Sequence, residues 1–118
     1  MARFRLSAPA EADLARILAA SAARWGPEGR RRYAALLAAA LRRVAADPEG
    51  PATRDRADLT PGIRSLHIRH ARGDDPRTAV KRPVHIVYYR ATRPGSVEIV
   101  RVLHERMEPS RHVGMGGD

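Results

Sequence analysis

Arginine and histidine side chains supply most of the groups in this sequence that could do chemistry. All of the 22 lysine and arginine residues except Lys81 are arginine, and the five histidines lie between His67 and His112. Arginine binds phosphate through paired hydrogen bonds, and histidine exchanges protons near neutral pH. The residues expected on a sheet or just after it are Arg64, His67, Arg69, His70, Arg90, Arg101, His104, Arg106, Arg111 and His112. Such a set could clamp phosphates, although a solvated sheet face is the simpler interpretation in a chain this rich in arginine.

Other catalytic chemistries find no support in the sequence. There is no cysteine, so the chain has neither a disulfide nor a thiolate metal ligand. The histidines include no HxxxH pair, and neither a G-x-S-x-G motif nor a glycine-rich phosphate loop occurs. We therefore expect no metal ion and no cofactor, and hydrolase, kinase and metalloenzyme functions are unsupported.

The formal net charge is +9 at pH 7, which would attract nucleic acid, anionic lipid or an acidic protein. The charge is spread along the chain, and a genome rich in arginine and alanine codons would explain part of it. The N-terminus interleaves charged and apolar residues, and no segment has the roughly 20 apolar residues that a membrane span needs. Together with the absence of cysteine, this pattern predicts a cytoplasmic protein that does not insert into membranes.

The elements that must position the basic groups follow from apolar periodicity. Residues 3–6 alternate between charged and apolar types, which predicts a short first strand. Ser7 can cap a helix that has Pro9 in its first turn, where the missing N–H costs nothing. Apolar residues at three- and four-residue spacing continue to Gly26, and this pattern predicts an amphipathic helix.

A second helix is predicted directly after the first. Helical spacing resumes at Pro27 and stops at Asp47, which precedes a proline. Because the turn between the two helices is short, they should pack as an antiparallel hairpin. Residues 48–62 contain three prolines and two glycines without an apolar period, so we expect a surface loop there.

The apolar period becomes twofold after this loop. It predicts strands over about 63–70, 84–90 and 97–104, the last two joined by a turn. Residues 71–83 carry charge, proline and glycine with little apolar content, which indicates a mobile link. Tyr88 and Tyr89 point to opposite faces of their strand, so at most one of them should belong to the core.

These elements make one α+β domain at residues 1–113, followed by a disordered tail at 114–118. The helical hairpin should pack on one face of a small sheet dominated by antiparallel pairs. Apolar runs around Ile99 indicate that the last strand lies inside the sheet and not at its edge. The sheet face opposite the helices is expected to be free for function.

Five segments, taken together and in order, resemble a known family. They are RLSAPAEADLARI, RWGPEGRRRY at the helix junction, LTPGIRSL, VHIVYYR in the third strand and VEIVRVLHERMEPSRH at the end. With these segments the chain resembles the ParE-type toxins of the RelE/ParE superfamily over residues 3–113. The order strand, helix, helix and three strands is also what this resemblance implies. The link at 71–83 is longer than in the shorter members of that superfamily.

The resemblance implies the toxin of a type II toxin-antitoxin system. A ParE-type toxin inhibits DNA gyrase without being an enzyme, arrests growth, and is neutralised by a ParD-like antitoxin in a heteromeric complex. The RelE branch instead cuts messenger RNA on the ribosome, and Arg69, Arg106 and His112 would then be its two arginines and its acid or base. The ending LHERMEPSRH resembles the ParE type, which favours gyrase. A toxin fold without retained toxicity is a third alternative.

Candidate contact residues follow from these placements. Those for the target are Arg64, Arg90, His104, Arg106 and Arg111. Those for the antitoxin are Leu14, Leu18, Trp25, Tyr33 and Leu37, because an apolar helical hairpin and a free strand edge both invite a partner segment. A single tryptophan at a helix end is more often a core or junction anchor than a binding hot spot.

Overall fold

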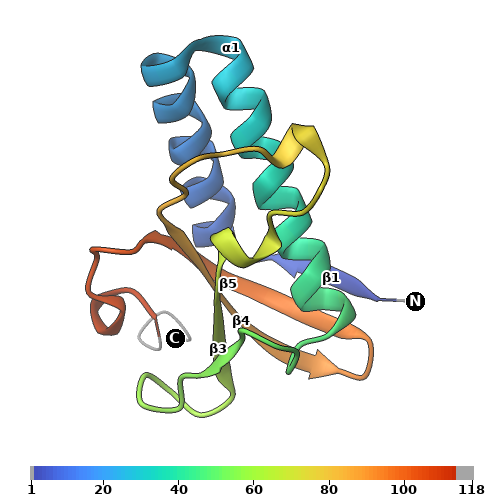
Figure 1. The fold of residues 1–118 in the computed structure, drawn as a ribbon. Helices are drawn as coiled ribbons and strands as arrows, with labels where there is room; N and C mark the ends of the chain where they lie inside the picture. The colour runs from blue at the N-terminus through green and yellow to red at the C-terminus, as the bar shows by residue number, and fades with distance from the viewer. Residues whose placement is uncertain (1, 114–118) are drawn as a thin grey trace.

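The computed structural model describes residues 2–113, which form one helix and five strands (Figure 1). The elements are β1 (Arg3–Leu6), α1 (Ala8–Ala46), β2 (Arg54–Asp55), β3 (Ile63–His67), β4 (His85–Arg93) and β5 (Ser96–His104). Three short 3-10 helices are η1 (Ile68–Ala71), η2 (Pro76–Thr78) and η3 (Pro109–Arg111). The α+β class predicted from the sequence is confirmed. The tail expected at 114–118 lies outside the described residues.

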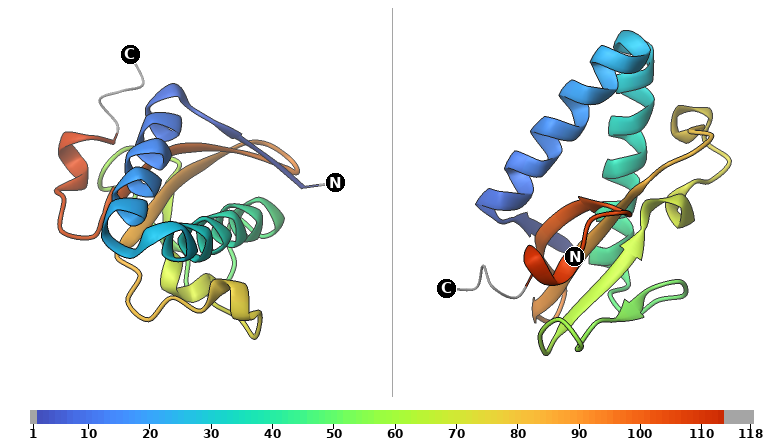
Figure 2. Two further views of the ribbon diagram at one scale, coloured as in Figure 1. Left: turned by 90° about the horizontal axis from the view of Figure 1, so that it is seen from above. Right: turned by 90° about the vertical axis from the view of Figure 1, so that its left-hand side faces the viewer.

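The helix α1 bends back on itself at Gly26. Ser7 caps its start, because the Ser7 Oγ accepts a hydrogen bond from the Ala10 backbone N–H at 3.1 Å. Gly26 has φ 76° and ψ −174°, a geometry that glycine adopts without steric cost. The two arms of α1 therefore run in opposite directions and lie side by side (Figure 1 and Figure 2). The sequence predicts two helices joined by a turn, and the structure describes a single element broken at this glycine.

The five strands form one sheet in the order β1-β5-β4-β3-β2. β1 pairs with β5 in parallel, and the other three pairings are antiparallel. β5 therefore lies inside the sheet, as its apolar runs predict. β1 and β2 form the two edges, and β2 is a two-residue strand in a segment predicted as loop.

Both faces of the sheet carry a buried apolar layer. The main core lies between the sheet and α1 and contains Tyr89. A separate cluster contains Tyr88 together with Ile63, Leu103 and Val113. Tyr88 is 2% exposed and Tyr89 is 0% exposed. The expectation that at most one tyrosine belongs to the core is wrong, because the C-terminal segment and the loop before β3 cover part of the second face.

β3 ends earlier than the sequence predicts. The twofold pattern runs to about residue 70, but strand pairing stops at His67 and η1 follows. The His67 Nδ1 accepts a hydrogen bond from the Arg69 backbone N–H at 3.1 Å, which turns the chain out of the sheet. Ile68 is fully buried in the main core, so an apolar residue that fits a strand pattern belongs to a helical turn.

The link at residues 71–83 contains η2, which contacts α1. Asp75 forms an ion pair with Arg77 at 2.8 Å, and the Arg72 guanidinium donates to the carbonyls of Val80 and Lys81. These local bonds shape a segment of low apolar content, and its mobility stays a prediction. Among the described residues, no helix combines the length and the hydropathy that crossing a membrane requires.

Candidate functional site

Three histidines lie at one end of the sheet, on three neighbouring strands. β3 ends at His67, opposite Ile86 of β4, and His85 at the start of β4 pairs with His104 at the end of β5. The rings of His85 and His104 pack edge to face with centroids 5.5 Å apart. These strand ends coincide because β3 and β5 both run antiparallel to β4. We call this part of the molecule the basic end, which consists of His67, Arg69, Arg82, His85, His104 and Arg106.

Tyr33, from the second arm of α1, is hydrogen-bonded to the basic end. Its hydroxyl accepts from the Val84 backbone N–H at 3.1 Å and lies 2.5 Å from the Nδ1 of His85. In the His85 tautomer with its proton on Nε2, Nδ1 accepts from the Tyr33 hydroxyl, which at the same time accepts from the Val84 N–H. Burial raises the pKa of Tyr33, so the hydroxyl stays protonated near neutral pH.

A hollow of about 290 Å³ opens beside this pair, between the first arm of α1 and the ends of β4 and β5. Trp25, Arg24 and His104 are among its lining residues. Trp25 stacks on Tyr33 with ring centroids 6.3 Å apart, and the Arg24 guanidinium lies 5.2 Å from the Trp25 ring. The hollow therefore has an aromatic wall beside arginine, a combination that can hold an apolar or an anionic group. No cluster of three or more His, Asp or Glu side chains within residues 2–113 could hold a metal ion.

His85 is neutral in the folded protein at pH 7. The pKa of His85 is lowered to about 4, mainly by burial and to a smaller extent by the neighbouring His104 and His67. This imidazole is therefore part of a neutral hydrogen-bond chain and does not serve as a base with a pKa near 7.

We expect the free energy of unfolding to fall as the pH drops from about 6.5 to about 4. In this range the unfolded chain takes up a proton on His85 that the folded chain does not, because folding lowers the pKa of His85 from its ordinary value of 6.5 to about 4. After allowance for solvent screening, the loss amounts to about 2 kcal/mol. Urea titrations at several pH values would measure it. His85→Asn should flatten this profile and His112→Asn should keep it; an unchanged slope in His85→Asn would contradict the assignment.

β3 and β5 end in the same local motif. The Nδ1 of His67 accepts from the Arg69 backbone N–H, and the Nδ1 of His104 accepts from the Arg106 backbone N–H, each at 3.1 Å. His67 donates through Nε2 to Glu105 at 2.7 Å. This hydrogen bond lowers the pKa of Glu105, so the carboxylate stays ionised. The two motifs bring Arg69 and Arg106 to the same end of the sheet.

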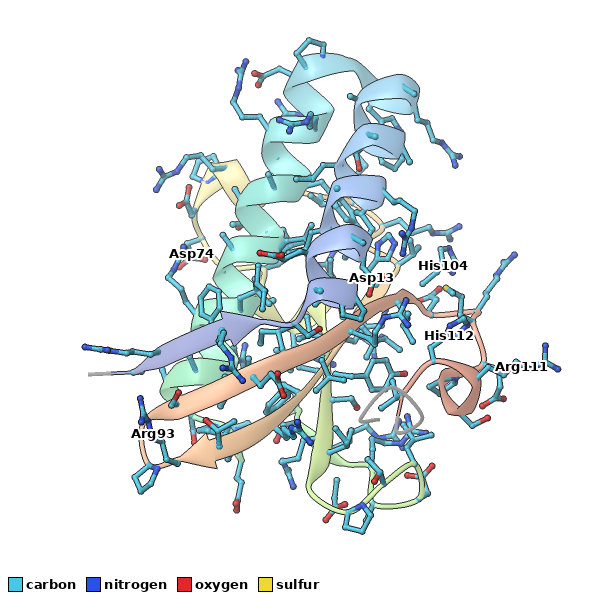
Figure 3. The ribbon with its side chains drawn as sticks, turned by 180° about the vertical axis from the view of Figure 1, so that it is seen from behind. Asp13, Asp74, Arg93, His104, Arg111 and His112 are labelled. Carbon is cyan, nitrogen blue, oxygen red and sulfur yellow. The ribbon has the colours of Figure 1, made fainter. Side chains whose placement is uncertain are left out.

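The three residues that a RelE-like nuclease would use lie in the segments that follow β3 and β5. Arg69 and Arg106 are exposed, and no hydrogen bond or ion pair within residues 2–113 connects either guanidinium with His112. The His112 carbonyl accepts from the Arg101 Nη1 at 3.5 Å, and Figure 3 shows His112 and Arg111 in the C-terminal segment beyond β5. General acid–base catalysis requires these groups to meet within hydrogen-bond reach of a substrate.

The five candidate target contacts differ in how free their side chains are. Arg64 is half-buried and holds the loop after α1, donating to the Pro48 carbonyl at 3.1 Å and to the Thr53 hydroxyl at 2.9 Å. Arg90 forms a cross-strand ion pair with Glu98 at 2.8 Å. The other three, which make no ion pair among the described residues, are His104, Arg106 and Arg111. All five stay predictions as target contacts, and the side chains of the second group have no carboxylate partner within the described residues to give up on binding.

The candidate antitoxin contacts also fall into two groups. Trp25 is 52% exposed, and Leu14 and Leu18 are partly buried against the main core. Tyr33 and Leu37 are 2% and 3% exposed, so they offer almost no contact surface in this conformation. Trp25 does lie at the junction of the two arms, but half of its surface is free, which the sequence does not predict.

Sequence reasoning missed a buried carboxylate that joins α1 to β5 (Figure 3). Asp13 is 3% exposed. It accepts from the Arg101 Nε and Nη2, both at 2.8 Å, from the Val102 backbone N–H at 2.9 Å and from Arg16 at 2.5 Å. One signal exists in the sequence, because Asp13 precedes Ile17 by one turn on the buried stripe, where a carboxylate needs a partner. Arg101 is thereby used inside the fold and is not free for a ligand.

The sequence matches one family model and several curated proteins. The family described as the ParE toxin of the type II toxin-antitoxin system, parDE, matches residues 4–109. Toxin ParE1 of Mycobacterium tuberculosis (strain ATCC 25618 / H37Rv) is 32% identical over 111 residues, covering 94% of this chain and 97% of that protein. Toxin ParE1 of Caulobacter vibrioides is 35% identical, with coverage of 97% and 100%. Toxin ParE of Escherichia coli is 36% identical, with coverage of 92% and 89%.

A solved structure, described as the chromosomal ParDE TA system from P. aeruginosa, shares the fold. Its TM-score is 0.61 at 18% sequence identity, and the match covers 88% of this chain and 95% of that chain. The family match spans most of the sequence, from β1 to the start of η3. The curated relatives align along nearly their whole length. The chain therefore belongs to the ParE toxin family of type II toxin-antitoxin systems.

Proposed function

We propose that this ParE-family toxin arrests growth by inhibiting DNA gyrase and is held inactive by a ParD-like antitoxin in a heteromeric complex. The family match over residues 4–109 carries the proposal. That match includes β5 and the turn after it, the segment whose sequence resembles the ParE-type ending rather than the RelE-type one. An inhibitor that acts by binding needs an exposed surface that contacts its target, and the exposed basic residues offer a positively charged one.

The three histidines of the basic end are used within the fold, which supports a structural role for them. The Nδ1 atoms of His67, His85 and His104 are all engaged, by the Arg69 N–H, the Tyr33 hydroxyl and the Arg106 N–H respectively. His67 also uses its Nε2 toward Glu105. A ribonuclease of the RelE type would need an acid or base poised near a ribose hydroxyl, whereas a gyrase inhibitor has no such requirement.

The antitoxin surface proposed here consists of Leu14, Leu18, Trp25 and the free edge of β1. β1 pairs with β5 on one side only, and a strand edge can accept an added strand through its backbone groups. The first arm of α1 presents its partly buried leucines beside the half-exposed Trp25. Because the chain carries a net charge of +9, an acidic antitoxin segment would be attracted to it.

Induced expression of the chain without its antitoxin should stop growth, trap gyrase on cleaved DNA and induce the DNA-damage response. Bulk messenger RNA should stay intact, and co-expression of the cognate antitoxin should restore growth. His112→Ala should keep this activity, because it removes at most one surface contact. Arg106→Glu should weaken it, because the variant reverses an exposed charge. Growth curves, covalent gyrase–DNA complexes and primer extension on messenger RNA would measure these effects.

The same experiment separates the two branches of the superfamily. A nuclease that depends on His112 as acid or base would lose roughly 10²–10⁴ in rate in His112→Ala. Codon-phased cuts in ribosome-bound messenger RNA that disappear in this variant would replace the gyrase proposal with the nuclease. Arg106→Glu is expected to weaken both mechanisms, so it reports only that this surface matters.

A further inference from the structure

We infer that the basic end binds the phosphate backbone of duplex DNA. The inference rests on the proposed function and deepens it, because gyrase holds duplex DNA and the toxin would then contact both components of that complex. Its exposed binding groups are the guanidinium groups of Arg69, Arg82 and Arg106. The backbone sets where these side chains start: Arg69 follows β3, Arg82 precedes β4 and Arg106 follows β5.

The three arginines start from the same end of the sheet, because the strand ends that precede or follow them are paired with one another. Arg69 and Arg106 each follow a histidine that accepts their backbone N–H, which fixes where their side chains begin. Arg82 lies two residues before Val84, whose carbonyl accepts from the Glu105 N–H at 2.7 Å. The main-chain positions are therefore set before any ligand arrives, which reduces the ordering cost of binding.

These guanidinium groups are free, unlike most others in the chain. Arginines paired with a carboxylate or holding a carbonyl include Arg16, Arg43, Arg56, Arg64, Arg77 and Arg101. Arg69, Arg82 and Arg106 are exposed, and their guanidinium groups make no hydrogen bond or ion pair within the described part of the chain. Guanidinium binds phosphate through two parallel hydrogen bonds. Unpaired guanidinium groups that start from one end of a sheet are suited to binding phosphates along a strand.

Duplex DNA fits this surface better than single-stranded nucleic acid. Single strands are bound mainly by stacking of bases on exposed aromatic rings. Phe4 and Trp25 are the exposed aromatic side chains of the described residues. Phe4 belongs to edge strand β1, and Trp25 is already stacked on Tyr33 and contacted by Arg24. The basic end itself has exposed arginines and no Phe, Tyr or Trp, so it can contact the charged phosphates that a duplex presents on its outside.

Glu105 opposes this binding from within the surface. It lies next to Arg106, is ionised because its hydrogen bond to His67 lowers its pKa, and has a side chain that is 41% exposed. A carboxylate among three arginines repels a phosphate that approaches them. Its removal should therefore strengthen binding, a gain that damage to the fold would not produce.

The experiment is fluorescence anisotropy of the antitoxin-free chain with a short labelled DNA duplex over a range of salt concentrations. Three phosphate contacts give a slope of about −2.7 in log K against log salt, which is roughly a 40-fold loss of affinity between 50 and 200 mM. The double variant Arg69→Glu/Arg106→Glu should flatten this slope by about 1.8 and weaken binding at least about tenfold at low salt. Glu105→Gln should tighten binding about threefold. Thermal melts would show that each variant is folded.

A matched control reverses Arg93, at the opposite end of the sheet, and Arg54, on the edge strand β2. Arg54 and Arg93 are exposed and unpaired among the described residues, and Figure 3 shows Arg93 far from His104. Arg54→Glu/Arg93→Glu changes the net charge equally and should weaken binding less than about threefold. Equal losses in both double variants would overturn the inference in favour of general charge attraction. Binding to single-stranded RNA but not to duplex DNA would also overturn it.

Gyrase binding is measured separately, by retention of gyrase on the immobilised toxin without DNA. Retention of gyrase together with absence of duplex binding would overturn the DNA inference and leave the proposed target standing. Duplex binding that depends on Arg69 and Arg106, without any retention of gyrase, would support the inference and contradict the proposed target.

Discussion

Replacing Asp13 with alanine is expected to lower the free energy of unfolding by about 3–5 kcal/mol. The variant would leave the Arg101 guanidinium, whose side chain is 17% exposed, and the Val102 backbone N–H without their acceptor. In the parent chain, the hydrogen bonds that Arg101 donates to Asp13 raise the pKa of Arg101. Arginine stays charged in the variant as well, so its desolvation is no longer compensated. Asp13→Asn keeps one acceptor oxygen and should lose less. Urea denaturation of both variants would measure the difference. If Asp13→Ala does not fold, Asp13→Asn still tests the prediction.

The two arginines that bind Asp13 provide the control. Arg16 donates to the same carboxylate, but its side chain is 66% exposed, whereas the Arg101 side chain is 17% exposed. Exposed pairs contribute about 0–1 kcal/mol, so Arg16→Ala should change the free energy of unfolding by less than about 1 kcal/mol. Arg101→Ala should cost several times more free energy of unfolding, because it removes two hydrogen bonds from a carboxylate that stays buried. Equal losses in the two variants would show that burial of the pair does not determine its contribution.

The local elements were predictable because their signals are local. The three- and four-residue spacing on both sides of Gly26 predicts the two arms of α1, and the capping role of Ser7 is confirmed by its hydrogen bond to the Ala10 N–H. Alternation predicts β4 and β5 within a few residues of their bounds. The interior position of β5 was also predictable, because a strand that is apolar on both sides must be covered by neighbours.

The features that sequence reasoning missed depend on contacts between distant segments. Asp13 and Arg101 are 88 positions apart, and no local pattern connects them. Tyr88 is buried because Val113 and the loop before β3 cover the second face, which alternation along one strand cannot show. The end of β3 at His67 depends on a side-chain hydrogen bond to the Arg69 N–H, which competes with strand continuation.

The same limit applies to the candidate site. Composition predicts that arginine and histidine are the groups available for binding, but it cannot say which of them form hydrogen bonds or ion pairs within the fold. Arg64 and Arg101 are held by the loop after α1 and by Asp13, whereas Arg69 and Arg106 are free. The difference lies in whether an acceptor from elsewhere in the chain comes within reach, and that is a property of the tertiary structure.

Replacing Gly26 with alanine is expected to lower the free energy of unfolding by about 1–3 kcal/mol. An added Cβ would meet nothing within 4 Å, so the cost comes from the backbone alone, at φ 76° and ψ −174°. Gly73→Ala is the matched control, because Gly73 also has open space around it and no positive φ. It should be neutral or stabilising by up to about 1 kcal/mol, through reduced freedom of the unfolded chain.

Trp25, the single tryptophan, stacks on Tyr33 next to the bend, so its fluorescence should shift in Gly26→Ala only. Unchanged fluorescence and stability in that variant would show that the bend in α1 does not need this glycine.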